Sequence, residues 1–407
     1  MAGTGGTSGR AGVVGLGTMG AGIAEVLARG GWSVTGVEEQ PDALTRAEGR
    51  IMASTAYAES RGKLAEGEGA AVRARLSYET SIDALADCDL VVEAVPELPE
   101  LKQRVFARLD AVVGANALLA TNTSSLSVTS LAASTSDPSR VVGLHFFNPA
   151  PVQPLVEVIS TVLTSAGTLD RVREILAGLG KTTIACRDRA GFVVNGLLIG
   201  YLNSAATWYE RGYATREEID DALVSAGMPM GPLALLDLVG LDVTVAVLQR
   251  MYLQFGDRRY LPAPLLTSLV EAGLLGRKTG RGLYTYDGST PTATTTGAPG
   301  VVPPPPASRA GELPEALLVP YLNDALTMVG VGYASPATVD TGMSLGCRMP
   351  PPFDQLAAIG PERALAVQRQ VFDETADPGY RPALLLEQLA AADDPDLALH
   401  VLRRADR

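Results

Sequence analysis

A glycine-rich segment near the start of the chain, Gly15-Leu16-Gly17-Thr18-Met19-Gly20, limits the possible folds more than any other feature. It follows a short apolar run over residues 11–16 and opens a helical pattern that stops at Gly30-Gly31. A second apolar run, 33–37, ends directly before Glu38. A G-x-G-x-x-G segment between a strand and a helix, with an acidic residue after the next strand, is typical of a dinucleotide-binding α/β domain.

Each residue of this pattern has a physical reason. Gly15 permits the tight turn, Gly17 lets the backbone approach a pyrophosphate at the helix N-terminus, and Gly20 allows the helix to pack closely on the strand. Thr18 and Met19 belong to the same expected cofactor contact. Glu38 would accept hydrogen bonds from ribose hydroxyls and, with Glu39 beside it, repel a 2′-phosphate, so NAD is expected rather than NADP. The alternative is a glycine-rich turn without a ligand.

The remaining chain continues the α/β pattern as far as about residue 188. Further apolar runs, mostly separated by helical segments, occur at 90–95, 117–121, 140–144, 156–159 and 182–186. This alternation predicts a parallel sheet covered on both faces. We therefore expect a flexible tail over 1–10 and an α/β Rossmann-type NAD-binding domain over 11–188. Helical periodicity over 189–287 predicts a separate all-α domain.

A repeat indicates that this all-α domain occurs twice. The segment Tyr201–Ala205 recurs as Tyr321–Ala325, and Asp220 recurs as Asp340, with an offset of 120. A nearly constant offset over about 40 positions favours duplication. The Thr-, Pro- and Gly-rich stretch 288–313 reads as a linker to a second, degenerate helical domain over 314–407.

Composition disfavours several classes of partner. The net charge of −12 disfavours binding to nucleic acid and to anionic membranes. No apolar run approaches the roughly 20 residues of a membrane span. The three cysteines, Cys88, Cys186 and Cys347, show no metal-ligand spacing, so we expect no metal site and a reducing, cytoplasmic location.

Three polar positions are candidates for chemistry. His145, one of only two histidines, lies twelve positions before Glu157, and a histidine–carboxylate pair is a common acid/base arrangement. The cluster Thr121–Ser125 directly follows an apolar run, where loops face the ligand crevice of a doubly wound sheet, although a serine there can also cap a helix. Asn195 lies where the helical domain starts. Taken singly, His145 and Asn195 have ordinary packing or polar-contact explanations.

Together these segments resemble the 3-hydroxyacyl-CoA dehydrogenase family. The resemblance spans roughly residues 11–286, and its motifs, in the family's order, are GLGTMGAGIA, VVEAVPE, TNTSSL, GLHFFNPAP, LVEVI, GFVVNGLL, GMPMGPLALLDLVGLD and GRKTGRGLYTY. It implies an NAD-dependent oxidoreductase of fatty acid metabolism and β-oxidation that interconverts 3-hydroxyacyl-CoA and 3-ketoacyl-CoA. It also implies that residues 189–287 form the substrate-binding and dimerisation domain.

The resemblance assigns roles to individual residues. His145 is expected to be the general base with Glu157 as its carboxylate partner, while Ser124 and Asn195 hold the 3-oxygen of the substrate. Glu97 and Lys102 are expected near the nicotinamide ribose, with Asn122 also on the cofactor side. Asn148 is assigned to the substrate pocket, and Lys63, with Arg61, to the acyl-CoA tail.

The second helical copy is expected to be structural, because Glu315 stands where Asn195 stands in the first. Single-copy members of the family dimerise through this domain, so a fused copy leaves either a monomer or a homodimer. Two other functions remain open. One is a dehydrogenase of another 3-hydroxy acid, free or bound to a carrier protein; the other is a non-catalytic NAD-binding protein.

Overall fold

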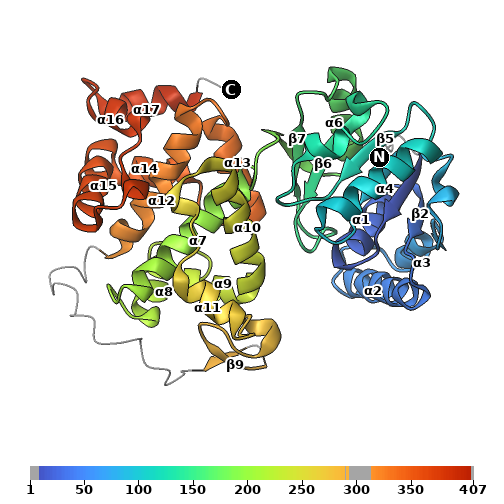
Figure 1. Cartoon of the computed structure of the whole chain (residues 1–407), viewed down its shortest axis with the longest axis horizontal. Helices are drawn as coiled ribbons and strands as arrows, with labels where there is room; N and C mark the ends of the chain where they lie inside the picture. Colours follow the sequence, from blue (N-terminus) through green and yellow to red (C-terminus); the bar gives the residue numbers. More distant parts are fainter. Residues whose placement is uncertain (1–8, 289, 293–312, 405–407) are drawn as a thin grey trace. The chain divides into compact units, whose positions relative to one another are not determined.

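The computed structural model describes residues 9–288, 290–292 and 313–404. They belong to two compact units, one ending at Phe192 and the other beginning at Val193 (Figure 1). Most of the expected tail and linker, residues 1–8, 289 and 293–312, lies outside the described residues. Two strands extend past the expected limits: Arg10 belongs to the first strand, and residues 290–292, in the expected linker, form a short strand.

The first unit is built on one mixed sheet, which confirms the Rossmann-type fold. Its strands are β1 (Arg10–Val14), β2 (Ser33–Val37), β3 (Leu76–Glu79), β4 (Leu90–Glu93), β5 (Leu118–Thr121), β6 (Val141–Phe146), β7 (Leu155–Ser160) and β8 (Thr182–Arg187). Their order across the sheet is β3-β2-β1-β4-β5-β6-β7-β8. The helices are α1 (Thr18–Arg29), α2 (Pro41–Ser60), α3 (Glu68–Arg73), α4 (Pro99–Val112), α5 (Val128–Ala132) and α6 (Ala166–Gly178).

Two strands of the sheet differ from the expectation: β3, which is parallel to β2, matches none of the expected apolar runs, and β7 is antiparallel to β6. β3 is an edge strand whose residues alternate between exposed and partly buried, so no continuous apolar run announces it. β7 runs antiparallel to β6, while β8 is parallel to β7. The cause lies in the connection, because the loop 147–154 returns directly from β6 to β7 without the crossover helix that a parallel neighbour requires.

One face of this sheet carries the main apolar core. Side chains of α1 and α6 pack there against alternate strand residues, among them Leu144 and Phe146 of β6 and Val156 and Val158 of β7. Because successive residues of a strand point to opposite faces, His145 and Glu157 lie on the other face. On that face Val128 of α5 packs against Gly143.

The second unit contains two runs of helices in the same order. The first run is α7 (Val194–Glu210), α8 (Arg216–Ser225), α9 (Pro232–Val239), α10 (Leu241–Phe255) and α11 (Pro264–Glu271). It is followed by the strands β9 (Thr285–Asp287) and β10 (Thr290–Thr292), which pair in antiparallel fashion. The second run is α12 (Leu313–Gly330), α13 (Pro336–Cys347), α14 (Pro352–Ile359), α15 (Pro361–Thr375) and α16 (Leu384–Ala390), and α17 (Pro395–Arg404) follows it. Among the described residues, no single helix has the length and apolar character to cross a membrane; by those criteria alone, α9 and α10 pass only as a pair bent by 96°.

Corresponding asparagines make the same bonds in both runs. The side chain of Asn203 accepts from the N–H of Ala263 and donates to the carbonyl of Leu261. Asn323, at an offset of 120, accepts from Ala383 and donates to Arg381. These matched bonds favour the predicted duplication, which stays a prediction.

The two runs pack on each other through α7 and α12. The rings of Tyr201 and Tyr321 meet there with centroids 5.4 Å apart. Arg259, which follows α10, pairs with Asp324 of α12, and both side chains are largely buried. An ion pair withdrawn from water is costly to break, because the remaining partner keeps an uncompensated charge.

We expect Asp324→Asn to lower the free energy of unfolding by about 3 kcal/mol, the low end for a buried pair, because Arg259 keeps its bonds to Asp257. The control is Asp242→Asn at the more exposed Lys278–Asp242 pair, where the expected loss is about 0–1 kcal/mol. Urea unfolding of both variants measures the difference. Equal losses would contradict a stabilising role for the buried pair.

Candidate active site

Most of the expected site residues of the first unit lie where the strands of the sheet have their carboxyl ends. β1, β4, β5 and β6 are parallel neighbours, so their carboxyl ends lie together. The glycine segment follows β1, Glu97 follows β4, Ser124 follows β5, and His145 is close to the end of β6. In an open α/β sheet this edge is where ligands bind.

The glycine segment has the geometry that close approach of a dinucleotide requires. Gly15 has a φ of +85°, a conformation that favours glycine. A Cβ placed on Gly20 would lie 1.8 Å from the carbonyl oxygen of Gly15, so α1 packs on the turn only without a side chain there. A Cβ on Gly17 would meet no atom within 4 Å. The N-terminus of α1 is therefore open to a phosphate group.

The other expected cofactor residues of this segment lie at or beside the glycine turn. Thr18 is exposed and Met19 is partly buried in the first turn of α1. Glu38 follows β2, and its carboxylate accepts a hydrogen bond of 3.1 Å from the N–H of Leu16. This bond places the acidic group beside the glycine turn.

His145 and Glu157 form a buried pair. They are direct partners in the antiparallel register of β6 and β7, so their side chains stand side by side on one face. The Nδ1 atom of His145 lies 2.6 Å from Oε2 of Glu157. The two residues are 7% and 0% exposed. A buried carboxylate at hydrogen-bond distance from Nδ1 favours the tautomer that leaves the lone pair on Nε2.

Aromatic rings and a thiol surround this pair. The imidazole centroid lies 4.6 Å from that of Phe147 and 5.7 Å from that of Phe192. Phe192 has a φ of +47°, a strained conformation for a residue with a side chain. The Sγ atom of Cys186, on β8, donates a bond of 3.7 Å to Oε1 of Glu157. The histidine is therefore held in a mostly apolar setting.

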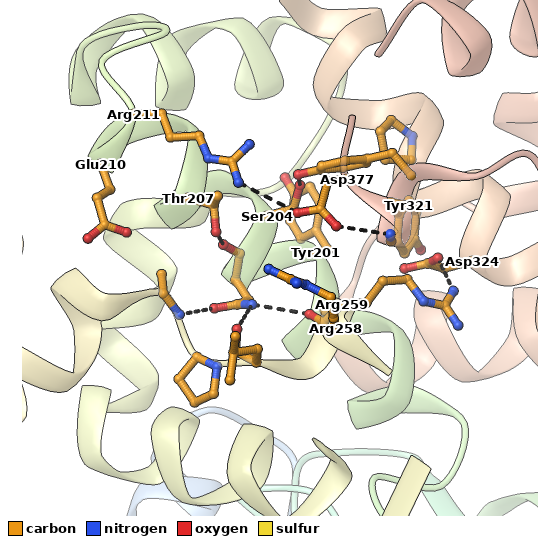
Figure 2. Close-up of a pocket in the computed structure, with 18 of the residues that line it drawn as sticks. Tyr201, Ser204, Thr207, Glu210, Arg211, Arg258, Arg259, Tyr321, Asp324 and Asp377 are labelled. Carbon is orange, nitrogen blue, oxygen red and sulfur yellow. Dashed lines mark hydrogen bonds and ion pairs between the residues drawn. The ribbon is translucent and has the colours of Figure 1, made fainter. Parts of the chain in front are cut away.

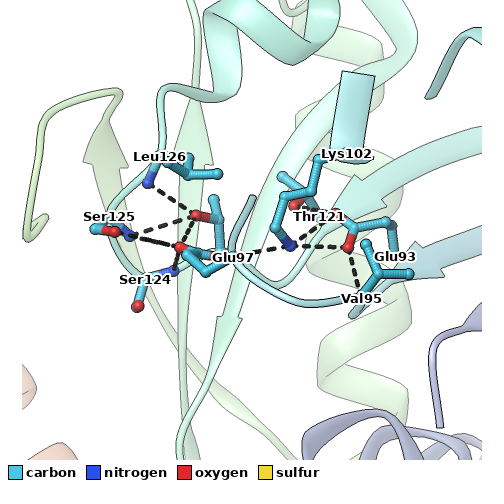
Figure 3. A network of polar contacts seen from close by, with 9 residues as sticks. Glu93, Val95, Glu97, Lys102, Thr121, Ser124, Ser125 and Leu126 are labelled. Carbon is cyan, nitrogen blue, oxygen red and sulfur yellow. Dashed lines mark hydrogen bonds and ion pairs between the residues drawn. The ribbon is translucent and has the colours of Figure 1, made fainter. Parts of the chain in front are cut away.

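Glu97 organises the loop that carries Ser124. Its Oε1 accepts from the hydroxyl of Thr123 at 2.5 Å and from the N–H groups of Ser124 and Ser125 at 3.1 and 3.2 Å. Figure 3 shows the Ser124 side chain turned away from the Glu97 carboxylate. Burial by itself would raise the pKa of Glu97, but Lys102, Thr123 and the N–H of Ser124 outweigh it and lower that pKa.

Lys102 lies beneath this loop. It is 1% exposed, and its Nζ donates to both carboxylate oxygens of Glu93 at 2.8 and 3.0 Å. It also lies 3.3 Å from Oε2 of Glu97. Glu93 is fully buried and accepts from Val95 N–H and the Thr121 hydroxyl as well (Figure 3). Lys102 thus links the ends of β4 and β5 to Glu97.

The remaining expected site residues have different surroundings. The side-chain oxygen of Asn122 accepts from the N–H of Phe146 at 2.9 Å, which joins the ends of β5 and β6. Asn148 is exposed in the loop 147–154, and Lys63 is exposed in the turn after α2. Asn195 lies in the first turn of α7, in the second unit.

Sequence reasoning missed Glu93, Cys186 and Phe192 as neighbours of the site. Glu93 gave one usable signal, an acidic residue at the end of an otherwise apolar strand. Cys186 and Phe192 gave none, because only the pairing of β7 with β8 and the backbone turn after β8 bring them to Glu157 and His145. Within the described part of the chain, no cluster of three or more His, Cys, Asp or Glu side chains could hold a metal.

A cavity of about 390 Å³ lies elsewhere, wholly within the second unit between α7 and α12 (Figure 2). Its charged lining residues are Glu210, Arg211, Arg258, Arg259, Asp324 and Asp377. Most of these pair with one another, as Arg211 does with Asp377 and Arg259 with Asp324. The cavity contains none of the expected cofactor or acid/base residues, so its size alone does not identify it as the active site.

The sheet and the glycine segment define the class of protein, an NAD-dependent oxidoreductase. Family models place the chain more narrowly. Residues 10–189 match the NAD-binding domain of 3-hydroxyacyl-CoA dehydrogenase. Residues 191–286 and 314–398 match the C-terminal domain of the same enzymes. The chain belongs to the 3-hydroxyacyl-CoA dehydrogenase family.

Individual relatives agree with this family. A 3-hydroxybutyryl-CoA dehydrogenase of Mycobacterium tuberculosis is 48% identical over 281 residues, which cover 68% of this chain and 98% of the relative. A 3-hydroxyadipyl-CoA dehydrogenase of Escherichia coli is 44% identical over 67% of this chain and 58% of its own length. The crystal structure of a 3-hydroxybutyryl-CoA dehydrogenase from E. coli K12 covers 94% of this chain and 98% of its own, with a TM-score of 0.85 and 33% identity.

The lowered pKa of Glu97 predicts a pH-dependent contribution to stability. The pKa of Glu97 is lower in the folded chain than its ordinary value of 4.5. The ionised carboxylate therefore stabilises the folded state at pH values above 4.5. We expect wild type to have a higher free energy of unfolding than Glu97→Gln above about pH 4.5. This difference should disappear as the pH falls below about 4.5 and through the lower pKa that Glu97 has in the folded state. Urea unfolding between pH 7 and pH 3 measures this. A difference that does not change with pH would contradict the assigned contacts.

Proposed function

We propose that this chain interconverts 3-hydroxyacyl-CoA and 3-ketoacyl-CoA, with His145 as the acid/base residue and Glu157 as its partner. The observation that carries the proposal is the buried contact of 2.6 Å between His145 Nδ1 and Glu157 Oε2, at the sheet edge that also carries the glycine segment. Family membership and the CoA thioesters in the names of the relatives support the substrate class.

The proton chemistry follows from the tautomer. Bound NAD supplies the acceptor for the hydride that leaves C3 of the substrate. With Nδ1–H held by Glu157, His145 takes the hydroxyl proton on Nε2, and the buried carboxylate stabilises the imidazolium that forms. In the reverse direction the same imidazolium returns the proton to the 3-oxygen.

Ser124 and Asn195 are the proposed donors to the 3-oxygen. The Glu97 bonds fix the backbone of Ser124 and leave its hydroxyl outside the network, which suits this role. We assign Glu97 to the nicotinamide ribose and Asn122 to the same side. Because Lys102 is buried against Glu93, we assign it an indirect role through Glu97. Asn148 and Lys63, with Arg61, remain the proposed contacts for substrate and acyl-CoA tail.

The second helical run is proposed to be structural. Glu315, at the position that corresponds to Asn195, pairs with Arg363 at 2.8 Å in a partly exposed ion pair. A carboxylate there would repel, rather than donate to, a substrate oxygen. The domain limits 11–188, 189–287 and 314–407 and a monomeric or homodimeric state are part of the same proposal.

We expect His145→Gln to lower kcat for acetoacetyl-CoA reduction by roughly 10²–10⁴-fold, the range of general acid–base catalysis, with the NADH dissociation constant unchanged. The other histidine, His400, lies on α17 and provides the matched control His400→Gln, which should keep the wild-type rate. Absorbance at 340 nm measures turnover. A near-normal rate for His145→Gln would overturn the acid/base assignment.

The substrate class needs its own experiment. 3-Ketoacyl groups of increasing chain length should be offered with NADH as CoA thioesters, as carrier-protein thioesters and as free acids. We expect the highest kcat/KM for the CoA series. Turnover of the free acids alone would instead select a dehydrogenase of free 3-hydroxy acids, and no turnover of any series would favour a non-catalytic NAD-binding protein.

A further inference from the structure

The loop 147–154 links the two halves of the proposed acid/base pair. It leaves β6 just after His145 and enters β7 just before Glu157. A two-residue hairpin fixes the register of its strands by turn geometry, but a longer connection such as this one does so less strictly. Inside the loop, the N–H groups of Val152 and Gln153 both donate to the carbonyl of Pro149. Contacts from outside the loop must therefore contribute to its position.

Lys181 supplies such a contact. It lies directly before β8, and its Nζ donates to the carbonyls of Ala150 and Gln153, both at 2.7 Å. The next residue, Thr182, donates its N–H to the carbonyl of Pro154 at 2.8 Å. A single side chain thus bridges two carbonyls on either side of the loop's turn and joins them to the strand that flanks Glu157.

The loop also packs on α1. A Cβ placed on Gly22 would lie 3.2 Å from Cβ of Ala150 and 3.3 Å from Cδ of Pro151. Gly22 is two residues beyond the glycine segment. The loop is therefore held by contacts with both α1 and Lys181, with little room to move toward α1.

The surroundings of Lys181 favour its role as a hydrogen-bond donor over a role as a positive charge. Among the described residues it makes no ion pair; burial lowers its pKa to about 8, and the nearby positive Arg29 adds to this effect. Placing an amine here is unfavourable unless its N–H groups are used. A neutral amine still has two N–H groups, enough for both carbonyls, so the bridge persists when the lysine loses its proton.

We propose that Lys181 is a positioning residue for the acid/base step. By bridging Ala150 and Gln153 it fixes the loop that aligns His145 with Glu157 and presents Asn148. This role rests on the proposed function, because it assumes that His145 transfers the proton. Lys181 itself touches neither atom of the His145–Glu157 contact and acts only through the loop.

The test is a graded series at position 181, with kcat for acetoacetyl-CoA reduction and KM for NADH as readouts. Lys181→Met keeps the apolar stem without donors and should lower kcat about 10- to 100-fold, since a displacement of about 1 Å at a catalytic group can cost 10²-fold. Lys181→Arg, with two terminal NH2 groups, should recover most of the rate, and Lys181→Gln, which is shorter, should fall between them. KM for NADH should change less than twofold throughout.

Lys278→Met is the matched control, because it also removes two Nζ bonds, here to Asp242 in the second unit, and should leave kcat unchanged. Thermal unfolding shows which variants are folded, and if Lys181→Met is not, the Arg and Gln variants still decide. Equal kcat across the folded variants, or a loss of stability without a loss of kcat, overturns the positioning role. His145→Gln in the same assay separates this result from a failure of the proposed function. If His145→Gln is inactive, the proposed function stands even when the role of Lys181 is overturned. If His145→Gln is active, the proposed function itself is overturned.

Discussion

The antiparallel pairing of β6 with β7 is the constraint on which the site depends. It sets His145 directly opposite Glu157, and the side-chain alternation of the two strands turns both away from the main apolar core. A slip of one residue between the strands would send one member of the pair to the opposite face. The apolar residues on either side of His145 and Glu157 oppose such a slip, because it would bring their side chains out of the core.

A second constraint is the burial of charge at the strand ends. Lys102 is surrounded by two carboxylates, Glu93 and Glu97, in a chain whose net charge is already −12. Without this ammonium group, Glu93 would be an uncompensated buried charge. With the ammonium group of Lys102 present, the Glu97 carboxylate accepts hydrogen bonds from the N–H groups of Ser124 and Ser125. The position of the proposed substrate serine therefore depends on a lysine that lies below the surface.

The sequence predicted the parts of this site that depend on local pattern. The glycine segment, Glu38 and the apolar runs of β1, β2, β4 and β5 follow from residue spacing, and the structure confirms their arrangement in a Rossmann-type sheet. The antiparallel orientation of β7 could not be predicted, because an apolar run does not show in which direction its strand pairs with a neighbour. The same limit explains why the sequence did not place Cys186 and Lys181 near the site, since each reaches it only through the pairing of β8 with β7.

In the helical unit, some residues that are 120 positions apart make matching contacts and others do not. Asn203 and Asn323 make equivalent bonds, and Tyr201 meets its own counterpart Tyr321. Arg259 and Asp324, however, correspond to Gly379 and Ser204, and Ser204 instead bonds the Tyr380 hydroxyl at 2.8 Å.

Because Arg259 occurs only in the first run and Asp324 only in the second, the ion pair requires one run of each kind. Two copies of the first run would place Arg259 opposite a serine, and two copies of the second would bury Asp324 opposite a glycine. The second arrangement leaves Asp324 buried without its partner, and the first leaves Arg259 with only its bonds to Asp257. Only unlike runs provide both members of the ion pair, so the contact favours the combination that a single chain already contains.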